Sequence, residues 1–380
     1  GAGTYSDGKL YTRSNKRGSI DKILQLFYQF GADDRVLYEA HPHIGTNKLP
    51  GIIAAMRDSI VSAGGEVHFK ERVVDILIDK KSIKGIKTES GKEYLADQVI
   101  LATGHSARDI FQLLVDKKIK IDQKPFAIGV RIEHTQSLID SCQYKLTSRP
   151  EYLPPASFSL VTQTKYKGVQ RGVFSFCMCP GGFIVPSATA QNQVVVNGMS
   201  PSRRDSKYAN SGIVVSIAPE DYHDYRDYGV LAGMHMQENL EQNAHKLVGS
   251  TQQAISQLTG DFIKRKTSRS ANETSYIPGL VAGDVRTFLP EFISEPLSLG
   301  LQDFDKKIKN FSSNLGQLIG LESRTSSPVK IPRDPITLEH PEINGLFPCG
   351  EGAGYAGGIM SAAIDGIRCA DAIRMKMKHA

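Results

Sequence analysis

Residues 346–366 constrain the fold of this chain more than any other stretch of its sequence. A short apolar run leads through a glycine-rich loop into a helical stretch of small residues. The glycines of this segment are Gly350, Gly352, Gly354, Gly357, Gly358 and Gly366. Glycine allows the positive φ angles of a tight turn and lets a ligand approach the main chain. Because a helix follows directly, its unpaired N–H groups and positive dipole end would face that ligand. The segment therefore predicts a strand, a loop and a helix built around an electron-rich group.

The spacing of three of these glycines formally matches a phosphate-binding fingerprint. Gly352, Gly354 and Gly357 fit the pattern G-x-G-x-x-G. In that fingerprint a second strand follows, and an acidic residue about 20 positions further on binds the ribose. Here a single helical stretch follows the loop, so the second strand is not expected. A flavin ring edge or a carboxylate therefore fits the loop better than a nucleotide phosphate.

Length and composition predict a globular protein of two domains. The 380 residues exceed the size at which one hydrophobic core usually stops growing. No uncharged apolar run approaches the roughly 18 residues of a membrane helix, and the first residues lack a signal-peptide pattern. The five cysteines are scattered and odd in number, which argues against a disulfide scaffold and for a reducing compartment. We therefore expect a cytoplasmic protein without a membrane segment.

The net charge of +6 and the isoelectric point near 8.9 raise the question of nucleic acid binding. The densest basic cluster is residues 264–266 with Arg269. No interleaved aromatic residues follow it, so a stacking platform for bases is not indicated. We expect a solvated loop or helix end there, and we disfavour nucleic acid as a partner. A mild positive field that attracts anionic substrates or cofactors is the better use of this charge.

The first third of the chain carries alternating helix and strand signals. Ser19 precedes a helical pattern that stops at Gly31, and a second helical pattern covers residues 49–63. Short strands separated by turn sequences are predicted at residues 66–69, 73–78, 83–88 and 93–95. Residues 99–102 lack alternation, as a parallel strand covered on both faces does. This order of elements predicts part of an α/β cofactor domain.

The pattern of predicted elements changes near Pro125, after which strands predominate. Strands are predicted at residues 126–133, 158–164, 169–178, 194–198 and 213–217. Helices are predicted at residues 234–258 and around residues 304–315, and the chain then returns through residues 324–332 to the glycine-rich segment. We therefore predict an α/β fold in two domains. Residues 1–125 and 318–380 would form a split cofactor domain, and residues 126–317 would form an inserted α+β domain that covers its ligand.

Residues 350–358 and the helix after them resemble the C-terminal flavin-contacting segment of FAD-dependent oxidoreductases. The likeness is greatest to the bacterial family of uncharacterised FAD-dependent dehydrogenases, also described as NAD(FAD)-utilising. Three further segments are similar to that family: residues 1–10, residues 99–104 with their Ala-Thr-Gly strand end, and residues 322–329. The resemblance implies an FAD/NAD(P)-binding Rossmann-like domain and an oxidoreductase of unknown substrate.

The family's N-terminal βαβ unit, with its G-x-G-x-x-G motif, has no counterpart in this sequence. The resemblance therefore implies an incomplete Rossmann-like domain whose first βαβ unit is missing. Because that unit supplies most pyrophosphate contacts, we expect weak FAD binding by this chain. Two functions stay open: part of a longer FAD-dependent oxidoreductase, or a cofactor-free binding or scaffold domain derived from a flavoprotein.

The resemblance also implies a set of cofactor-binding residues. In it, Glu351 accepts from a ribityl hydroxyl, and the helix that begins near Ile359 and Met360 faces the charge of the reduced flavin. The implied cofactor contacts are Gly1, Ala2, Gly3, Thr4, Ser6, Asp7, Gly8, Lys9, Leu10, Val73, Val74, Thr103, Gly104, Gly350, Glu351, Gly352, Gly354, Gly357, Gly358, Ile359 and Met360. A nicotinamide nucleotide is the implied electron donor.

Candidate substrate contacts carry weaker signals. Arg324, Thr325 and Ser326 offer a cation and hydroxyls close in sequence to the strand that returns to the loop, which suits a small anionic substrate. Cys177 and Cys179 lie two apart on a predicted strand and therefore on one face. They are either a redox pair beside the flavin or buried structural cysteines. No zinc spacing is present, so we expect no metal, and the sequence does not identify catalytic residues.

Overall fold

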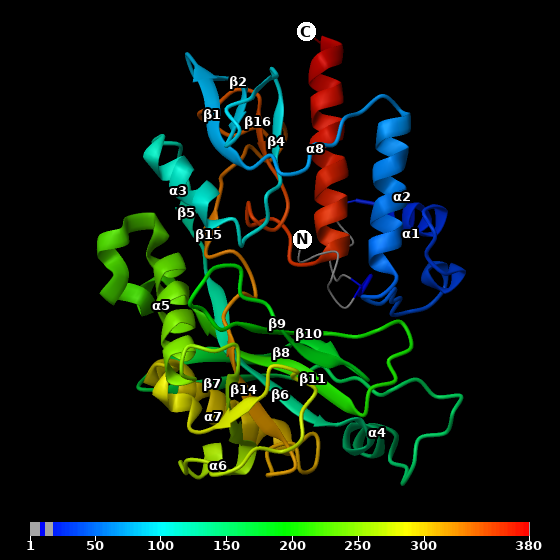
Figure 1. Cartoon of the computed structure of the whole chain (residues 1–380), viewed down its shortest axis with the longest axis vertical. Coiled ribbons are helices and arrows are strands. Elements are labelled where there is room, and N and C mark those ends of the chain that lie inside the picture. The colour runs from blue at the N-terminus through cyan, green and yellow to red at the C-terminus, as the bar shows by residue number, and fades with distance from the viewer. Residues whose placement is uncertain (1–7, 12–17, 380) are drawn as a thin grey trace.

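The computed structural model describes residues 8–11 and 18–379, which form two bodies, one above the other in Figure 1. The helices are α1 (Ile20–Gln29), η1 (Asp34–Leu37), α2 (Leu49–Ser62), α3 (Arg108–Asp116), α4 (Gln136–Tyr144), η2 (Pro219–Leu231), α5 (Ala232–Leu247), α6 (Thr259–Ile263), η3 (Val285–Thr287), α7 (Glu291–Asp305) and α8 (Ile359–His379). Across these described residues, no helix combines the length and the apolar character needed to span a bilayer.

The strands of the described residues fall into five sheets. They are β1 (Val73–Asp79), β2 (Ser82–Thr88), β3 (Glu93–Leu95), β4 (Val99–Leu101), β5 (Asp122–Gln123), β6 (Phe126–Thr135), β7 (Val161–Tyr166), β8 (Val169–Cys179), β9 (Phe183–Pro186), β10 (Val196–Met199), β11 (Tyr208–Ile217), β12 (Ala254–Leu258), β13 (Leu280–Ala282), β14 (Gln317–Glu322), β15 (Val329–Lys330) and β16 (Leu346–Pro348).

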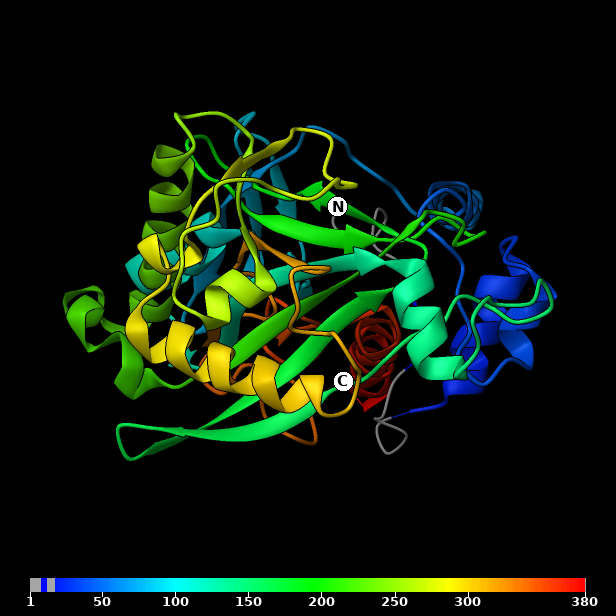
Figure 2. The ribbon, with the colours of Figure 1, turned by 90° about the horizontal axis from the view of Figure 1, so that it is seen from below.

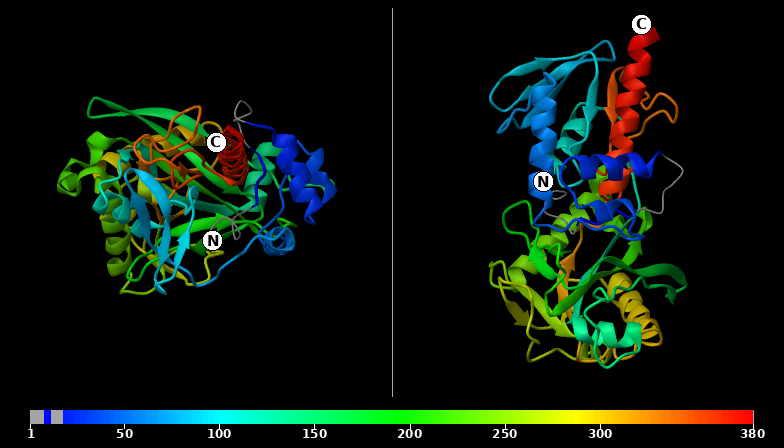
Figure 3. Two further views of the ribbon diagram at one scale, coloured as in Figure 1. Left: turned by 90° about the horizontal axis from the view of Figure 1, so that it is seen from above. Right: turned by 90° about the vertical axis from the view of Figure 1, so that its right-hand side faces the viewer.

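The upper body contains the elements on both sides of the predicted insertion. Strands β1, β2 and β3 form an antiparallel meander, and β4 pairs in parallel with β16, as the sequence predicts for residues 99–102. Helices α1, α2 and α8 accompany them, and α8 rises away from the lower body (Figure 3, right). Helix α1 begins where the Ser19 hydroxyl accepts from Lys22 N at 3.2 Å, and it is followed by Gly31 at φ +103°.

The strand predicted at residues 66–69 is wrong for the described part of the chain, where this stretch has no regular structure. Strand formation requires a neighbour that completes the backbone hydrogen bonds. The stretch is instead extended and solvent-facing, with Val67 38% and Phe69 68% exposed. These residues are apolar in part, as the sequence shows, but no strand of the described residues pairs with them.

The lower body is a seven-stranded mixed sheet in the order β13-β12-β14-β6-β11-β8-β7. All its pairings are antiparallel except that of β12 with β13. Helix α7 crosses one face of this sheet (Figure 2). Strand β6 is buried over nine of its ten residues because both faces of the sheet are covered there. Strand β14 belongs to this sheet, whereas residues 318–322 fall in the predicted cofactor domain.

Two predicted helices of the lower body are only partly helical. The helix expected at residues 234–258 ends with α5 at Leu247, where Gly249 and Ser250 take φ angles of +68° and +60°. The following residues form β12, because the sheet offers them a paired position between β13 and β14. The helix expected around residues 304–315 is the end of α7, after which the chain turns and Ser312 N donates to Asp305 at 2.9 Å.

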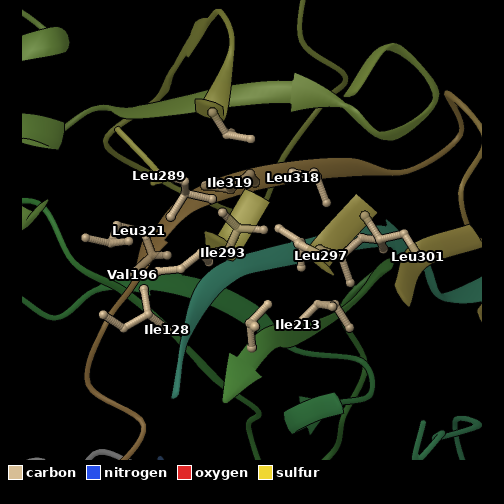
Figure 4. Close-up of a cluster of buried hydrophobic side chains, with 14 of the residues drawn as sticks. Ile128, Val196, Ile213, Leu289, Ile293, Leu297, Leu301, Leu318, Ile319 and Leu321 are labelled. Carbon is tan, nitrogen blue, oxygen red and sulfur yellow. The ribbon is translucent and has the colours of Figure 1, made fainter. Parts of the chain in front are cut away.

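A two-stranded ribbon connects the bodies. Strand β5 runs into the lower body and β15 returns from it, and the two pair antiparallel. A large apolar core fills the lower body between the sheet and α7 (Figure 4). Ile128, Ile213, Leu297 and Leu318 are all 0% exposed in it. A second core, in the upper body, also includes Leu231 at the end of η2 and Met234 of α5, so apolar contacts join the two bodies beside the ribbon.

The buried imidazole of His134 makes the stability of the lower body dependent on pH. Its Nε2 lies 2.9 Å from the carbonyl oxygen of Phe311, and the ring is 2% exposed. Burial lowers the pKa of His134 to about 4 from its usual 6.5. Between these values the unfolded chain binds a proton that the folded chain does not. Stability therefore falls as the pH falls from 6.5 towards 4, by about 3 kcal/mol.

We predict that His134→Gln, whose amide can still donate to Phe311, removes this part of the pH dependence. Urea unfolding of the wild type and the variant at pH 7.5, 5.5 and 4.5 measures it. The difference in unfolding free energy between the two proteins should change with pH. Parallel pH curves for wild type and His134→Gln would contradict the prediction.

Candidate functional site

The glycine-rich loop (residues 350–358) lies at the carboxyl ends of the parallel strands β4 and β16. Pro348 pairs with Leu101, so the segments that follow both strands leave the sheet at the same edge. A Cβ atom built on Gly352 would lie 2.5 Å from the carbonyl oxygen of Gly104. The loop therefore touches the end of the Ala-Thr-Gly segment, backbone against backbone. Two stretches predicted from distant parts of the sequence meet here.

An ion pair that the sequence did not indicate anchors the loop. The Gly350 N–H donates to Asp365 Oδ2 at 2.8 Å, and Arg333 binds both carboxylate oxygens of Asp365 and the carbonyl of Pro348. Burial raises the pKa of Asp365, but the hydrogen bonds from Arg333 and Gly350 outweigh it, so the pKa lies below its usual value. Asp365 therefore stays ionised and fixes the start of the loop from the second turn of α8.

The far end of the loop faces open space. Gly357 and Gly358 are exposed, and a Cβ atom on either would meet nothing within 4 Å. Helix α8 begins at the next residue, Ile359, and is 21 residues long. The hydroxyl of Ser361 accepts from Gly357 N at 3.1 Å and donates to Gly358 O. The helix N-terminus is thus accessible to a ligand, as anion binding at such a site requires.

Titratable groups flank the loop on its other side. His105 Nδ1 lies 3.6 Å from a carboxylate oxygen of Glu351, and both side chains are partly exposed. Burial lowers the pKa of Lys124, and the charge of Glu351 opposes this shift. The side chain of Lys124 also packs near Gly354, where a Cβ atom would lie 3.1 Å from Lys124 Cδ. Gly354 has φ +83°, so a side chain there would be strained as well as crowded.

Of the first ten residues, Gly8, Lys9 and Leu10 lie among the described residues. They form a short antiparallel contact with the segment around His43, and Leu10 N donates to Pro42 O at 2.9 Å. Leu10 and Met360 belong to one buried apolar cluster, so this segment lies on the same side of the upper body as the start of α8. The Lys9 ammonium donates to the carbonyl of Met178 in β8, which links the segment to the lower body.

The remaining implied cofactor contacts are not all at the glycine-rich loop. The candidates Gly1, Ala2, Gly3, Thr4, Ser6 and Asp7 fall outside the described residues. Thr103 is exposed beside Gly104. Val73 and Val74 are on β1, where they line a cavity of about 270 Å³ against α3. The structure thus brings Thr103 and Gly104 together with residues 350–360, links Leu10 to Met360 through one apolar cluster, and places Val73 and Val74 at the meander.

The cysteine pair sits at a bulge of β8. Asn210 pairs with Cys179 and Gly212 with Phe176, so the register shifts by one residue, and Cys177 takes φ +46°. The bulge lies at Cys177 itself and not in the Pro-Gly-Gly sequence that follows. Cys179 is fully buried and donates to the carbonyl oxygen of Cys177 at 3.3 Å. Both sulfurs are thiols.

The carbonyl of Cys177 also accepts from a buried cation, Arg131, at 2.6 Å. Arg131 is 0% exposed and binds Glu322 at 2.8 Å. This pair joins β6 to β14 inside the sheet. Thr325 has a comparable packing role, since its hydroxyl donates to Ala127 O at 2.8 Å, while Ser326 is partly exposed.

Arg324 is part of a buried junction between the two bodies. Glu241 on α5 is 0% exposed, and its two oxygens accept from Arg108 at 2.9 and 3.0 Å and from Arg324 at 2.9 and 3.0 Å. Arg324 also donates to Ser106 and Gln193. Burial raises the pKa of Glu241, but the hydrogen bonds from Arg324 and the charge of Arg108 hold it below its usual value. The guanidinium proposed for substrate is thus already bound within the protein.

The chain is similar to known proteins over most of its length. A family model described as "FAD-dependent protein, C-terminal domain-like" matches residues 125–325. An uncharacterized protein of Clostridium beijerinckii is 40% identical over 375 residues, which are 98% of this chain and 69% of that protein.

Similar solved structures were also found. An oxidoreductase from Methanosarcina mazei has 12% identity and a TM-score of 0.36 over 97% of this chain. A mutant of Amadoriase I from Aspergillus fumigatus has 15% identity and a TM-score of 0.34 over 89%. This chain spans 64% and 53% of those two structures, less than two thirds of their length.

The junction at Glu241 generates a prediction. Glu241→Gln keeps the shape of the side chain but leaves two buried guanidinium groups without a carboxylate, which should cost about 3–5 kcal/mol of unfolding free energy. Glu238→Gln, on the same helix at a partly exposed site, should cost less than about 1 kcal/mol. Urea unfolding compares the two. A loss below about 1 kcal/mol for Glu241→Gln would show that the junction does not hold the bodies together.

Proposed function

Because this chain belongs to the family of FAD-dependent proteins, we propose that it forms the flavin-facing and substrate-facing part of an FAD-dependent oxidoreductase, of dehydrogenase type. The observation that carries the proposal is the contact of the glycine-rich loop with Gly104 at the carboxyl ends of β4 and β16. This contact lies beside an accessible N-terminus of α8. Crevices at the carboxyl ends of parallel strands are where α/β folds bind their ligands.

The glycines of the loop have two different roles in this proposal. Gly352 and Gly354 lack side chains because protein backbone or Lys124 occupies the space where a Cβ atom would be. Gly357 and Gly358 face open space, and they are the glycines against which a ring edge can lie. The residues present therefore fit a flavin at the start of α8 but not at Gly352. The family resemblance implies a cofactor contact for all four of these glycines, whereas this proposal keeps that role for Gly357 and Gly358.

The chain's own residues then act on an FAD held by this loop. Bound FAD supplies hydride transfer through flavin N5. The N–H groups at Gly358 and Ile359 and the dipole of α8 would favour negative charge at the ring edge, and Glu351 would accept from a ribityl hydroxyl. His105 Nδ1 lies 3.6 Å from Glu351 on the neighbouring loop.

Exposed apolar side chains support the further proposal that the Rossmann-like domain is incomplete. Ile100 on the β4 strand is 39% exposed, and the extended stretch beside it exposes Val67 and Phe69. Helix α2 exposes Ile53 and Ile60 at 40% and 53%. Strands of a parallel sheet are usually covered on both faces and flanked by further strands. We propose that a βαβ unit covers this surface in the full-length protein and that this chain by itself binds FAD weakly.

The domain assignment and the partners are also proposals. We place the inserted unit at residues 126–322, supported by the position of β14 in the large sheet and by the family match to residues 125–325.

The proposed substrate is a small molecule, with anions favoured by the net charge of +6, and the proposed electron donor is a nicotinamide nucleotide. Five free thiols support a reducing cytoplasm as the location.

A titration of FAD tests the function. Visible absorbance recorded during the titration should give weak, saturable binding by this chain, and tight binding by a protein extended with the N-terminal βαβ unit. Tight stoichiometric binding by this chain would contradict the role of the missing unit. If neither protein binds FAD, the alternative holds, namely a cofactor-free binding or scaffold domain derived from a flavoprotein.

Two glycine variants of the extended protein separate the ligand face from the packing face. Gly358→Val adds a side chain in open space, so we predict a stable fold that loses FAD binding at least tenfold. Gly352→Ala places a Cβ atom 2.5 Å from Gly104 O, so we predict a fall in thermal stability even without FAD. Flavin affinity and the apoprotein melting temperature measure the two effects. An unchanged flavin affinity for Gly358→Val would contradict the proposed contact.

A further inference from the structure

Cys349 and Cys369 meet directly beneath the glycine-rich loop. Cys349 follows β16 and precedes Gly350, and Cys369 lies in the middle of α8. They are 3% and 0% exposed. Their sulfurs and a carboxylate oxygen of Asp365 lie within 4.8 Å of one another. The two sulfurs are therefore close neighbours in the interior.

A buried guanidinium makes the two thiols unequal. Arg333 Nη1 lies 3.5 Å from Cys369 Sγ, and the Arg333 side chain is 3% exposed. The neighbouring Cys349 thiol lowers the pKa of Cys369, burial raises it, and the charge of Arg333 lowers it further. The neighbouring Cys369 and burial raise the pKa of Cys349. Because the Arg333 guanidinium lies beside its sulfur, Cys369 is the nucleophile of the pair, while Cys349 keeps its proton.

Two cysteines and an aspartate at this separation can also hold a metal ion. Here a cation is already present, because Arg333 binds both oxygens of Asp365 and contacts Cys369. Asp365 accepts from Gly350 N as well. A metal would have to displace this guanidinium from a buried position. The cluster therefore fits thiol chemistry better than metal binding.

A polar cavity lies on the Arg333 side of the pair. A space of about 510 Å³ lies between the turn that joins β1 to β2 and residues 333–344, and Arg333 lines it together with Lys81, Glu339 and His340. Arg333 also contacts Cys369, whereas neither sulfur lines the cavity. Because both sulfurs are buried, a small neutral oxidant suits them, whereas a peptide disulfide is too large to reach them.

We propose that Cys349 and Cys369 are a redox modification site at which hydrogen peroxide forms a reversible disulfide. The Cys369 thiolate attacks one peroxide oxygen, the O–O bond breaks, and the leaving hydroxide takes a proton to become water. The Cys349 sulfur then attacks the Cys369 sulfenic acid, and a second water leaves with the Cys349 proton. Two thiols and one peroxide thus give one disulfide and two waters. The sulfurs must approach by under about 3 Å to reach the S–S length of roughly 2.05 Å.

The disulfide would lock the glycine-rich loop. It joins the residue before the loop to α8, in parallel with the contacts that Asp365 makes to Gly350 and Arg333. Closing a loop of about 20 residues constrains the unfolded chain, so we expect the melting temperature to rise by roughly 3–6 °C. The site needs no bound flavin, and its test is independent of the proposed function.

The experiment counts and maps thiols. Reduced protein is treated with a slight excess of hydrogen peroxide, quenched with catalase, denatured and alkylated, and then analysed by mass spectrometry. We expect two of the five thiols to be lost, a peptide cross-link between Cys349 and Cys369, and full recovery with dithiothreitol. Cys142→Ser, at a partly exposed thiol on α4, should lose the same two thiols as the wild type.

Trapping identifies the nucleophile. In Cys349→Ser the sulfenic acid has no partner, so dimedone should label Cys369, whereas in Cys369→Ser dimedone should leave Cys349 unlabelled. Retention of all five thiols, or a cross-link between Cys177 and Cys179 with Cys349 and Cys369 still alkylated, would overturn the proposal. A rise in melting temperature with zinc that both serine variants lose would identify a metal site instead and would overturn it equally. The mapping of the wild-type protein decides the matter even where a variant folds poorly.

Discussion

The buried carboxylate of Glu241 is the interaction on which the relation of the two bodies depends. It lies on α5, and it holds Arg108 from the first helix after the Ala-Thr-Gly segment and Arg324 from the irregular segment between β14 and β15. Two positive charges on one buried negative charge are stable only when all three groups remain together, because any one left alone would be buried unpaired. The junction therefore fixes how the lower body lies over the upper one.

Within the upper body, a second buried ion pair also fixes one segment of the chain against another. Asp365 and Arg333 hold the first residue of the glycine-rich loop, and the Gly352 backbone rests on Gly104. The start of the loop is therefore rigid, while its end at Gly357 and Gly358 faces open space. A rigid start and an accessible end suit a loop that presents a helix N-terminus to a ligand without closing over it.

The sequence predicted local features better than contacts between distant residues. The strands with strong apolar patterns, the meander after α2 and the strand, loop and helix of residues 346–379 follow from patterns of neighbouring residues. The stretches at residues 66–69 and 254–258 were mispredicted because strand formation depends on a partner that periodicity does not reveal. Arg333, Asp365, Glu241 and the roles of single glycines could not be predicted, since each depends on which distant residue lies beside it. Glu241 and Asp365 do not stand out from the other polar residues of their helices.

The antiparallel ribbon of β5 and β15 places the entry and the exit of the inserted unit side by side. The chain therefore crosses between the bodies in both directions at one place. The ribbon sets where the lower body is attached, and the Glu241 junction sets its orientation there. Two attachment points of different kinds, one covalent and one electrostatic, thus leave the lower body little freedom to rotate.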